Sequence, residues 1–222
     1  MHIETYADRE MLVMLVADTL AGELKNSLLS QDTVTLVVPG GTTPGPIFDA
    51  LCAADLEWDR VRVMLSDERW VPEDHARSNT ALVRQRLMVD RAGAAQFFPF
   101  YIDGLTPPEA AEQLSVKLTD DLPLSVMLLG MGADMHTASL FPGAKDLAEA
   151  LAPGAPNLVP VEVAGQEPRI SLSGPVLASA MSKHLVIFGD EKRAALEQAQ
   201  SSSTEEAPIR VALDGITVHW AE

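Results

Sequence analysis

The strongest chemical signal in this sequence is a carboxylate and an imidazole two residues apart, Asp134 and His136. They belong to residues 130–143, Gly-Met-Gly-Ala-Asp-Met-His-Thr-Ala-Ser-Leu-Phe-Pro-Gly, which directly follow an apolar stretch at residues 123–129. That stretch has the composition of a buried parallel strand. Ligands of open α/β sheets bind outside the carboxyl ends of the strands, so the pair is expected where proton-transferring groups would act.

Three interpretations of Asp134 and His136 are open from the residues alone. They could be two ligands of a metal ion, a general base with the carboxylate that orients it, or a capped turn with a surface histidine. A metal is the weakest of these, because no other His or Cys residues cluster nearby. The position after a strand favours the base with its carboxylate. Ser139 is a weaker candidate nucleophile, because no Gly-x-Ser-x-Gly elbow surrounds it.

A second strand end carries a loop that could hold a phosphate. Residues 32–38 are rich in β-branched side chains and predict a strand, and a helical pattern begins at residue 46. Between them a Gly-Gly-Thr-Thr run offers amides and hydroxyls at the start of a helix. Its members are Gly40, Gly41, Thr42 and Thr43. The nucleotide-binding pattern Gly-x-x-x-x-Gly-Lys is absent. A tight turn that needs only the backbone freedom of glycine is the alternative.

A third strand end places two acids beside an arginine. Residues 61–65 predict a buried strand, and Asp67, Glu68 and Arg69 follow it. These residues could form a surface ion cluster whose charges satisfy one another, or a set that faces a ligand. Their position directly after a buried strand favours a ligand-facing set.

The net charge of −16 makes the few cations near strand ends informative. Such a charge repels nucleic-acid phosphates and anionic membranes, so an anionic ligand needs local positive groups. Arg169 precedes a Ser-x-Ser-Gly-Pro turn, and Lys192 lies in the first turn of a predicted helix. The helix dipole disfavours a cation there, unless the cation faces an anion. A solvent-exposed lysine is the alternative.

The bulk composition predicts a cytoplasmic protein. No apolar run approaches the roughly 18 residues of a membrane span, and residues 1–5 lack the basic start and apolar middle of a secretory signal. The single Cys52 has no partner for a disulfide or a metal pair, and its helical context predicts a packing role.

The elements that position these loops alternate between strands and helices. Strands are predicted at residues 32–38, 61–65, 97–102, 124–129, 157–163, 183–188 and 216–220. Helices are predicted at residues 11–29 with Asp8 as N-cap, from 46, and at 78–88, 106–118, 175–181 and 189–200. This order predicts one α/β domain over residues 1–222, with a mainly parallel sheet and helices on both faces, doubly wound and Rossmann-like.

Taken together, these segments resemble the 6-phosphogluconolactonase family, within the wider group that includes the glucosamine-6-phosphate isomerases. The resemblance spans about residues 30–200, in the family's order and at its spacing. The matching segments are residues 39–44, 66–71 with 78–79, 130–143, 168–172, and the Gly-x-x-Lys of residues 189–192.

Within this group the resemblance favours the lactonases. Asp-Glu-Arg at residues 67–69 is similar to the lactonases, whereas the isomerases carry Asp-Glu-Tyr. The isomerases also carry Ile-Ala-Phe-Asn-Glu-Pro, and use that Glu in ring opening, where this chain has Thr-Ala-Ser-Leu-Phe-Pro. One departure is Met135, which replaces the family's glycine between Asp and His. If this position needs a left-handed backbone, methionine costs roughly 1 kcal/mol.

The resemblance implies hydrolysis of 6-phospho-D-glucono-1,5-lactone to 6-phospho-D-gluconate, in the oxidative branch of the pentose phosphate pathway. It implies that His136 is the general base on water and that Asp134 orients the imidazole. Arg69 would polarise the ester or bind substrate hydroxyls. The residues expected to bind substrate or phosphate are Gly40, Gly41, Thr42, Thr43, Asp67, Glu68, Asn79, Arg169 and Lys192. Whether Asp67, Glu68 and Asn79 touch substrate or brace Arg69 is open. No metal or organic cofactor is expected, because an ester needs no electron sink.

Two other functions remain open. One is an aminosugar-phosphate isomerase or deaminase, and the other is a non-catalytic effector domain that binds phosphosugars, as in some transcription regulators. Such regulators add a basic DNA-binding module, for which this acidic chain is expected to have no room. The expected partner is a phosphorylated sugar lactone, with neither nucleic acid nor membrane. The expected state is a monomer or a weak homo-oligomer.

Overall fold

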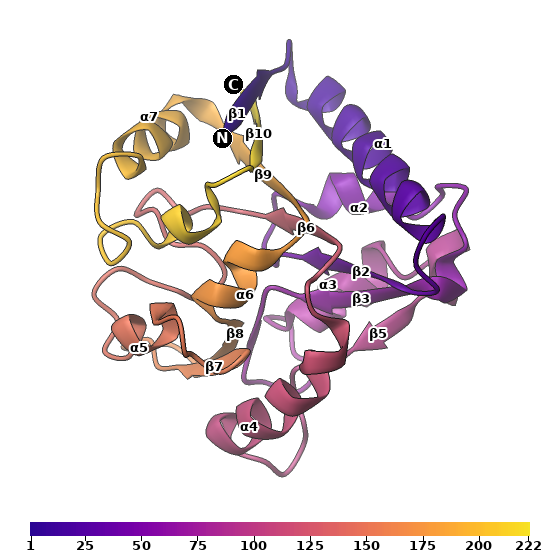
Figure 1. Cartoon of the computed structure of the whole chain (residues 1–222). Helices are drawn as coiled ribbons and strands as arrows, with labels where there is room; N and C mark the ends of the chain where they lie inside the picture. The colour runs from indigo at the N-terminus through magenta and orange to yellow at the C-terminus, as the bar shows by residue number, and fades with distance from the viewer.

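The computed structural model describes residues 1–222 and contains a seven-stranded parallel sheet in the order β1-β10-β9-β6-β2-β3-β5 (Figure 1). The strands are β1 (His2–Thr5), β2 (Val34–Val38), β3 (Val61–Leu65), β5 (Gln96–Phe98), β6 (Val126–Leu129), β9 (Ser182–Phe188) and β10 (Thr217–Ala221). Every pairing in this sheet is parallel. The predicted α/β class with a mainly parallel sheet is therefore confirmed.

The connections place helices on both faces of the sheet. The helices are α1 (Arg9–Leu28), α2 (Gly45–Leu51), α3 (Asn79–Arg86), α4 (Pro107–Leu118), α5 (Leu147–Leu151), α6 (Gly174–Ser179) and α7 (Gly189–Ala199). Parallel crossovers are right-handed, so connections that run in opposite directions along the sheet lie on opposite faces. The connections that contain α1, α2 and α3 run toward β5, and those with α4 to α7 run toward β1.

Short 3₁₀ helices complete the connections, at η1 (Trp58–Arg60), η2 (Asp90–Ala94), η3 (Thr119–Asp121) and η4 (Pro208–Ala212).

Side chains cap the first turns of three α-helices. Asp8 accepts a hydrogen bond from the Met11 amide, as expected for the predicted N-cap, and Ser78 caps α3 through the Ala81 amide. At α4, Thr106 and Glu109 form a capping box.

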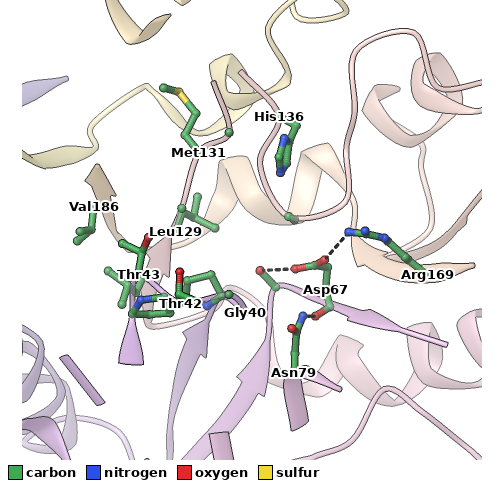
Figure 2. Close-up of a pocket in the computed structure, with 18 of the residues that line it drawn as sticks. Gly40, Thr42, Thr43, Asp67, Asn79, Leu129, Met131, His136, Arg169 and Val186 are labelled. Carbon is green, nitrogen blue, oxygen red and sulfur yellow. Dashed lines mark hydrogen bonds and ion pairs between the residues drawn. The ribbon is translucent and has the colours of Figure 1, made fainter. Parts of the chain in front are cut away.

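The direction in which the chain adds strands to the sheet reverses beside β2. The chain goes from β2 outward to β3 and β5, and its later half starts at β6 on the other side of β2. Such a reversal separates the two loops that leave the neighbouring strands and opens a crevice between them. The loops after β2 and β6, which carry Thr42 and His136, face each other there (Figure 2).

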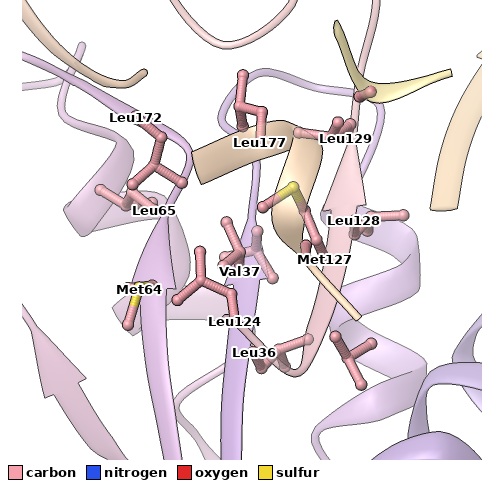
Figure 3. Packing of buried hydrophobic residues seen from close by; sticks show 14 of the residues in the cluster. Leu36, Val37, Met64, Leu65, Leu124, Met127, Leu128, Leu129, Leu172 and Leu177 are labelled. Carbon is pink, nitrogen blue, oxygen red and sulfur yellow. The ribbon is translucent and has the colours of Figure 1, made fainter. Parts of the chain in front are cut away.

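The core forms a single cluster of 56 buried residues on both faces of this sheet. All five residues of β2 are buried, as expected for a central strand with both faces covered. Val37 of β2 lies between its register partners Met64 of β3 and Met127 of β6 (Figure 3). These strands form a rigid base for the loops at their carboxyl ends. No helix combines the length and apolar character that crossing a membrane requires.

A second, three-stranded antiparallel sheet was not predicted. It consists of β4 (Asp67–Arg69), β8 (Arg169–Leu172) and β7 (Leu158–Val161), in the order β4-β8-β7. The sequence pattern predicted a strand at residues 157–163, but it did not show that this strand leaves the parallel sheet. Residues 67–69 were expected as loop and pair as a strand. A pattern of side chains reports burial along one segment, whereas the pairing partner is decided by distant segments.

Other differences concern short elements. The edge strand β1 was missed because three of its four residues are exposed and give no apolar pattern. The predicted strand at residues 97–102 is shorter, Gln96–Phe98, because Pro99 cannot donate to a sheet ladder.

A buried polar network fastens the N-terminal segment and α1 to the sheet. The Tyr6 hydroxyl lies 2.7 Å from Nδ1 of His219, and Nε2 of His219 lies 3.0 Å from Nδ1 of His184. Nε2 of His184 lies 2.8 Å from a carboxylate oxygen of Glu23 on α1. Both imidazoles are buried. Burial and the neighbouring His184 lower the pKa of His219 to about 4, against the opposing charges of Glu4 and Glu23.

This pKa makes stability depend on acid pH. His219 is neutral in the fold down to about pH 4, whereas the unfolded chain binds a proton below about 6.5. Its contribution is therefore fully present above about pH 6.5 and is lost as the pH falls toward 4, by up to about 3 kcal/mol. We expect the free energy of unfolding, measured with urea between pH 4 and 7, to fall less steeply in His219→Gln than in the parent. His2→Gln, at an exposed position, serves as control. Equal slopes in His219→Gln and the parent would refute this assignment.

Candidate functional site

A pocket of about 280 Å³ opens at the carboxyl ends of β2 and β6 (Figure 2). Its lining comes from five separate segments that the fold brings together. They are residues 39–44 after β2, Ser66, Asp67, Arg69 and Asn79 from the region after β3, residues 128–132 with His136 and Ala138 from β6 and its loop, Arg169 of β8, and Val186 with Lys192 from β9 and α7.

All predicted site residues except Asp134 and Glu68 line this pocket. Asp134 lies beside His136, in contact with its ring nitrogen. Glu68 lies on the other side of β4 from Asp67, fully buried. The loops named from sequence therefore meet at one place, and the two exceptions have structural explanations.

His136 and Asp134 form a tight hydrogen-bonded pair. Nδ1 of His136 lies 2.5 Å from Oδ1 of Asp134. An ionised carboxylate only accepts hydrogen bonds, so the neutral imidazole carries its proton on Nδ1 and leaves Nε2 free to accept one. Burial alone would raise the pKa of Asp134, but the hydrogen bond and charge of His136 outweigh it and hold this pKa below its ordinary value. The pair has the geometry of a general base with an orienting carboxylate.

The loop that carries this pair is a tight turn with little spare room. The Gly132 amide donates to the His136 carbonyl and the Met135 amide donates to the Gly132 carbonyl, both at 3.0 Å. A Cβ at Gly132 would overlap Nδ1 of His136 and Oδ1 of Asp134. Met135 has φ of 66°, the left-handed backbone that favours glycine. The predicted strain at Met135 is therefore present in this fold.

Cations dominate the charge of the pocket. Arg69, Arg169 and Lys192 line it, whereas Asp67 is the only carboxylate in the lining. Arg69 and Arg169 are direct cross-strand neighbours in the small sheet, an arrangement in which like charges repel. The Nε atoms of both arginines are buried and have no hydrogen-bond partner. A pocket with these features can hold an anion even though the whole chain is strongly acidic.

Arg169 is held in place from several directions. Nη2 donates to Oε1 of Gln166 at 2.5 Å, Nη1 lies 3.4 Å from Oγ of Ser139, and Nη1 lies 3.9 Å from Oδ2 of Asp67. Burial lowers the pKa of Arg169 from its ordinary value, against the opposing charge of Asp67. The guanidinium nevertheless stays a cation, because arginine does not deprotonate in proteins.

Asp67 is supported by the hydroxyls of Ser66 and Ser139, which were not expected as site residues from the sequence. Ser139 donates to Oδ2 of Asp67 at 2.5 Å, and Ser66 donates to Oδ1 at 3.1 Å. Ser139 is fully buried and does not line the pocket, so it is placed to support Asp67 and not to attack a substrate. The sequence feature that pointed to a role for Ser139 in the site is its place in the motif at residues 130–143. For Val186, no signal existed in the sequence.

Glu68 and Asn79 brace the site. Both oxygens of Glu68 accept hydrogen bonds at the start of α3, from the amides of Asn79 and Thr80 at 2.8 Å among others. Glu68 is the one expected binding residue that does not line the pocket, because its buried carboxylate is occupied by these hydrogen bonds. The Asn79 side chain lines the pocket, donates to the Asp67 carbonyl at 2.9 Å, and fills the space that a Cβ at Gly40 would need. Gly40 is thus required for close packing.

The residues described by the structure include no group of three or more His, Cys, Asp or Glu side chains arranged to hold a metal ion. The pocket lining provides a proton acceptor and fixed cations, and the acid that orients the proton acceptor lies beside it. This arrangement can activate a water molecule beside an anionic substrate.

Comparison with known proteins identifies the family. The family model described as glucosamine-6-phosphate isomerases/6-phosphogluconolactonase matches residues 7–220, and the chain belongs to this family. It is 39% identical to a 6-phosphogluconolactonase of Mesorhizobium japonicum, over 97% of this chain and 93% of the relative. It is 40% identical to a 6-phosphogluconolactonase of Pseudomonas aeruginosa, over 92% of this chain and 88% of the relative.

Solved structures agree with this assignment. The crystal structure of a 6-phosphogluconolactonase from Shewanella baltica superimposes with a TM-score of 0.95 at 30% identity, covering 100% of this chain and 97% of that chain. The family resemblance expected from the motifs is confirmed.

The lack of space for a Cβ at Gly132 leads to a first prediction for the site. Gly132→Ala is expected to break the hydrogen bond between His136 and Asp134, because the new Cβ overlaps both partners. The imidazole Nδ1 proton of His136, observed by NMR, should lose the downfield shift of a carboxylate-bound proton. Gly154→Ala is the control, since a Cβ there meets nothing within 4 Å. An unchanged Nδ1 resonance in a folded Gly132→Ala protein would contradict the expectation.

The left-handed backbone at Met135 generates a second prediction. Met135→Val should destabilise the protein by more than about 1 kcal/mol, because β-branched residues tolerate positive φ poorly. Met135→Gly should change the free energy of unfolding by less than about 1 kcal/mol, because relief of strain offsets lost packing. Met14→Gly, inside α1, is the contrasting substitution and should cost about 1 kcal/mol. Chemical denaturation measures all three. A Met135→Gly loss as large as that of Met135→Val would show that the backbone is not strained there.

Proposed function

We propose that this protein hydrolyses 6-phospho-D-glucono-1,5-lactone to 6-phospho-D-gluconate, in the oxidative branch of the pentose phosphate pathway. The observation that carries the proposal is the pairing of His136 with Asp134 at the edge of a pocket with cations on its other walls. The relatives described above are named for this activity. The pocket is close to the roughly 300 Å³ at which small-molecule sites begin, which suits a single phosphosugar.

In the proposed mechanism, His136 activates water. Nε2 of His136 takes a proton from a water molecule while the water oxygen attacks the lactone carbonyl carbon. Asp134 stabilises the imidazolium that forms, through the hydrogen bond to Nδ1. The carbonyl oxygen becomes an oxyanion, which Arg69 can stabilise from the pocket wall. When the oxyanion collapses, the ring carbon–oxygen bond breaks, and His136 returns its proton to the leaving alkoxide.

The phosphate is assigned to the cationic side of the pocket. Arg169 and Lys192 supply charge, and Gly41 and Thr42 supply amides and a hydroxyl. Holding the phosphate there places the lactone ring next to His136, so that binding of the phosphate also orients the carbonyl carbon toward the attacking water. Asp67 is placed to orient Arg169, because its carboxylate lies 3.9 Å from that guanidinium.

The aminosugar-phosphate isomerase alternative gains no support from the site. Its ring-opening Glu is absent from the loop after β6, and Asp67, the only carboxylate that lines the pocket, is engaged by Ser66 and Ser139.

The proposal also covers the domain organisation, location, partners and oligomeric state of the protein. We propose that residues 1–222 act as one catalytic domain, since one hydrophobic cluster includes residues from nearly every element. A cytoplasmic location follows from the substrate, because phosphorylated sugars are kept inside cells. The charge of −16 supports the absence of nucleic-acid partners. A monomer or weak homo-oligomer is expected and can be measured by sedimentation equilibrium.

Lactone hydrolysis above the spontaneous rate tests the proposal. His136→Ala should lower kcat by between about 10²- and 10⁴-fold, the usual contribution of a general base. Binding of 6-phosphogluconate, measured by calorimetry, should change much less, because the phosphate ligands are intact. Asp134→Asn should also lower kcat, since an amide no longer favours the productive tautomer. His75→Ala, at an exposed position outside the pocket, is the control.

Two outcomes would replace the proposal. A parent protein that binds 6-phosphogluconate without accelerating hydrolysis would be a phosphosugar-binding effector domain. Release of ammonia from glucosamine 6-phosphate would support the isomerase alternative.

A further inference from the structure

One aromatic ring beside the pocket, that of Phe141, contacts both the proposed base His136 and the proposed phosphate ligand Arg169. Phe141 follows the dyad in the loop after β6 and is itself absent from the pocket lining. The His136 ring lies with its centroid 4.3 Å from that of Phe141, at an interplanar angle of 32°. The Arg169 guanidinium carbon lies 5.1 Å from the centroid of the same ring. Phe141 therefore connects the proposed base to a proposed phosphate ligand.

His136 needs this contact to have a defined orientation. Its Nδ1 is bound to Asp134, whereas its Nε2 has no hydrogen-bond partner in the protein. A single hydrogen bond leaves the imidazole free to tilt about the line between donor and acceptor. The neighbouring aromatic face restricts that tilt, because offset aromatic contacts hold two rings at a preferred angle.

Arg169 also depends on the ring. Hydrogen bonds hold its Nη1 and Nη2 atoms from the edge of the guanidinium, to Ser139 and Gln166. Its Nε atom has no partner, and the like charge of Arg69 lies opposite it in the small sheet. The electron-rich face of a phenyl ring attracts a guanidinium and therefore helps to hold Arg169 against this repulsion.

We propose that Phe141 is a positioning residue that fixes the spacing between His136 and Arg169. In the lactone substrate, the reacting carbonyl carbon C1 and the phosphate-bearing carbon C6 are joined through the ring oxygen and C5, so the distance between the carbonyl and the phosphate is limited by the ring. The base and the phosphate ligand must therefore be separated by a set distance, and one rigid ring in contact with both sets it. This inference rests on the proposed function for its catalytic half. Its geometric half, the effect of Phe141 on the two side chains, is independent of that function.

Phe141→Leu tests the inference because leucine keeps apolar bulk and removes the aromatic face. We expect kcat to fall and KM to rise together, with a loss of about tenfold or more in kcat/KM, since small misplacements of catalytic groups are costly. Phe141→Tyr keeps the ring and should restore most of both parameters. Phe97→Leu is the matched control, because Phe97 lies under the guanidinium of Arg84 at 4.9 Å, outside the pocket. It should leave kcat and KM unchanged.

Two readouts do not depend on catalysis. The carbon-bound ring protons of His136 experience the ring current of Phe141, so their NMR shifts should move in Phe141→Leu and return in Phe141→Tyr. The Kd of 6-phosphogluconate, measured by calorimetry, should rise in Phe141→Leu because Arg169 is less well held. Phe141→Met provides a second ring-free variant if the leucine protein does not fold.

The outcomes separate this inference from the proposed function. Unchanged kcat, KM, His136 shifts and Kd in a folded ring-free variant would overturn the positioning role. A uniform loss in Phe141→Tyr as large as in Phe141→Leu would also overturn it, because the ring would then be irrelevant. If the parent protein does not hydrolyse the lactone, the proposed function fails, and the His136 shifts and the Kd still decide the role of Phe141.

Discussion

The site depends on the parallel pairing of β2 with β6, where the winding of the sheet reverses direction. Because the chain leaves these two neighbours toward opposite edges, nothing covers the space above their carboxyl ends. The loop after β2 supplies Thr42 and the loop after β6 supplies His136 to the same pocket, although 94 residues separate them. The buried central strands keep both loops at fixed positions, since interiors packed at crystal density do not deform continuously.

The small antiparallel sheet brings two cations together at the pocket of a strongly acidic chain. A net charge of −16 repels anions at long range, so an anionic ligand needs closely spaced cations. Pairing β4 with β8 places Arg69 directly opposite Arg169, both at the pocket wall. Their mutual repulsion is a cost of folding that Asp67 reduces only in part. A bound anion would reduce it further, which couples ligand binding to the stability of this sheet.

The loop after β6 concentrates several roles in one short segment. It presents His136, orients it through Asp134, supports Asp67 through Ser139 and contacts Arg169 through Phe141. Such density leaves little freedom for substitution, as the lack of room beside Gly132 shows. Met135 occupies a left-handed position in the middle of this loop, so the chain tolerates strain beside its proposed base. Strain of this kind persists only where surrounding contacts determine the backbone.

The class of fold and most of the pocket could be predicted from local sequence patterns, because strand ends in a parallel sheet share one edge and the loop motifs there are short and continuous. His136 with Asp134, the Gly40 to Thr43 loop, Arg169 and Lys192 were all recognisable on this basis. Which charged groups face the pocket depends on contacts between segments far apart in the sequence. The tertiary structure turns Glu68 inward to cap α3, places Arg69 against Arg169, and sets Phe141 between His136 and Arg169. Periodicity reports the burial of one segment, whereas strand pairing and side-chain contacts are set by segments far apart in the chain.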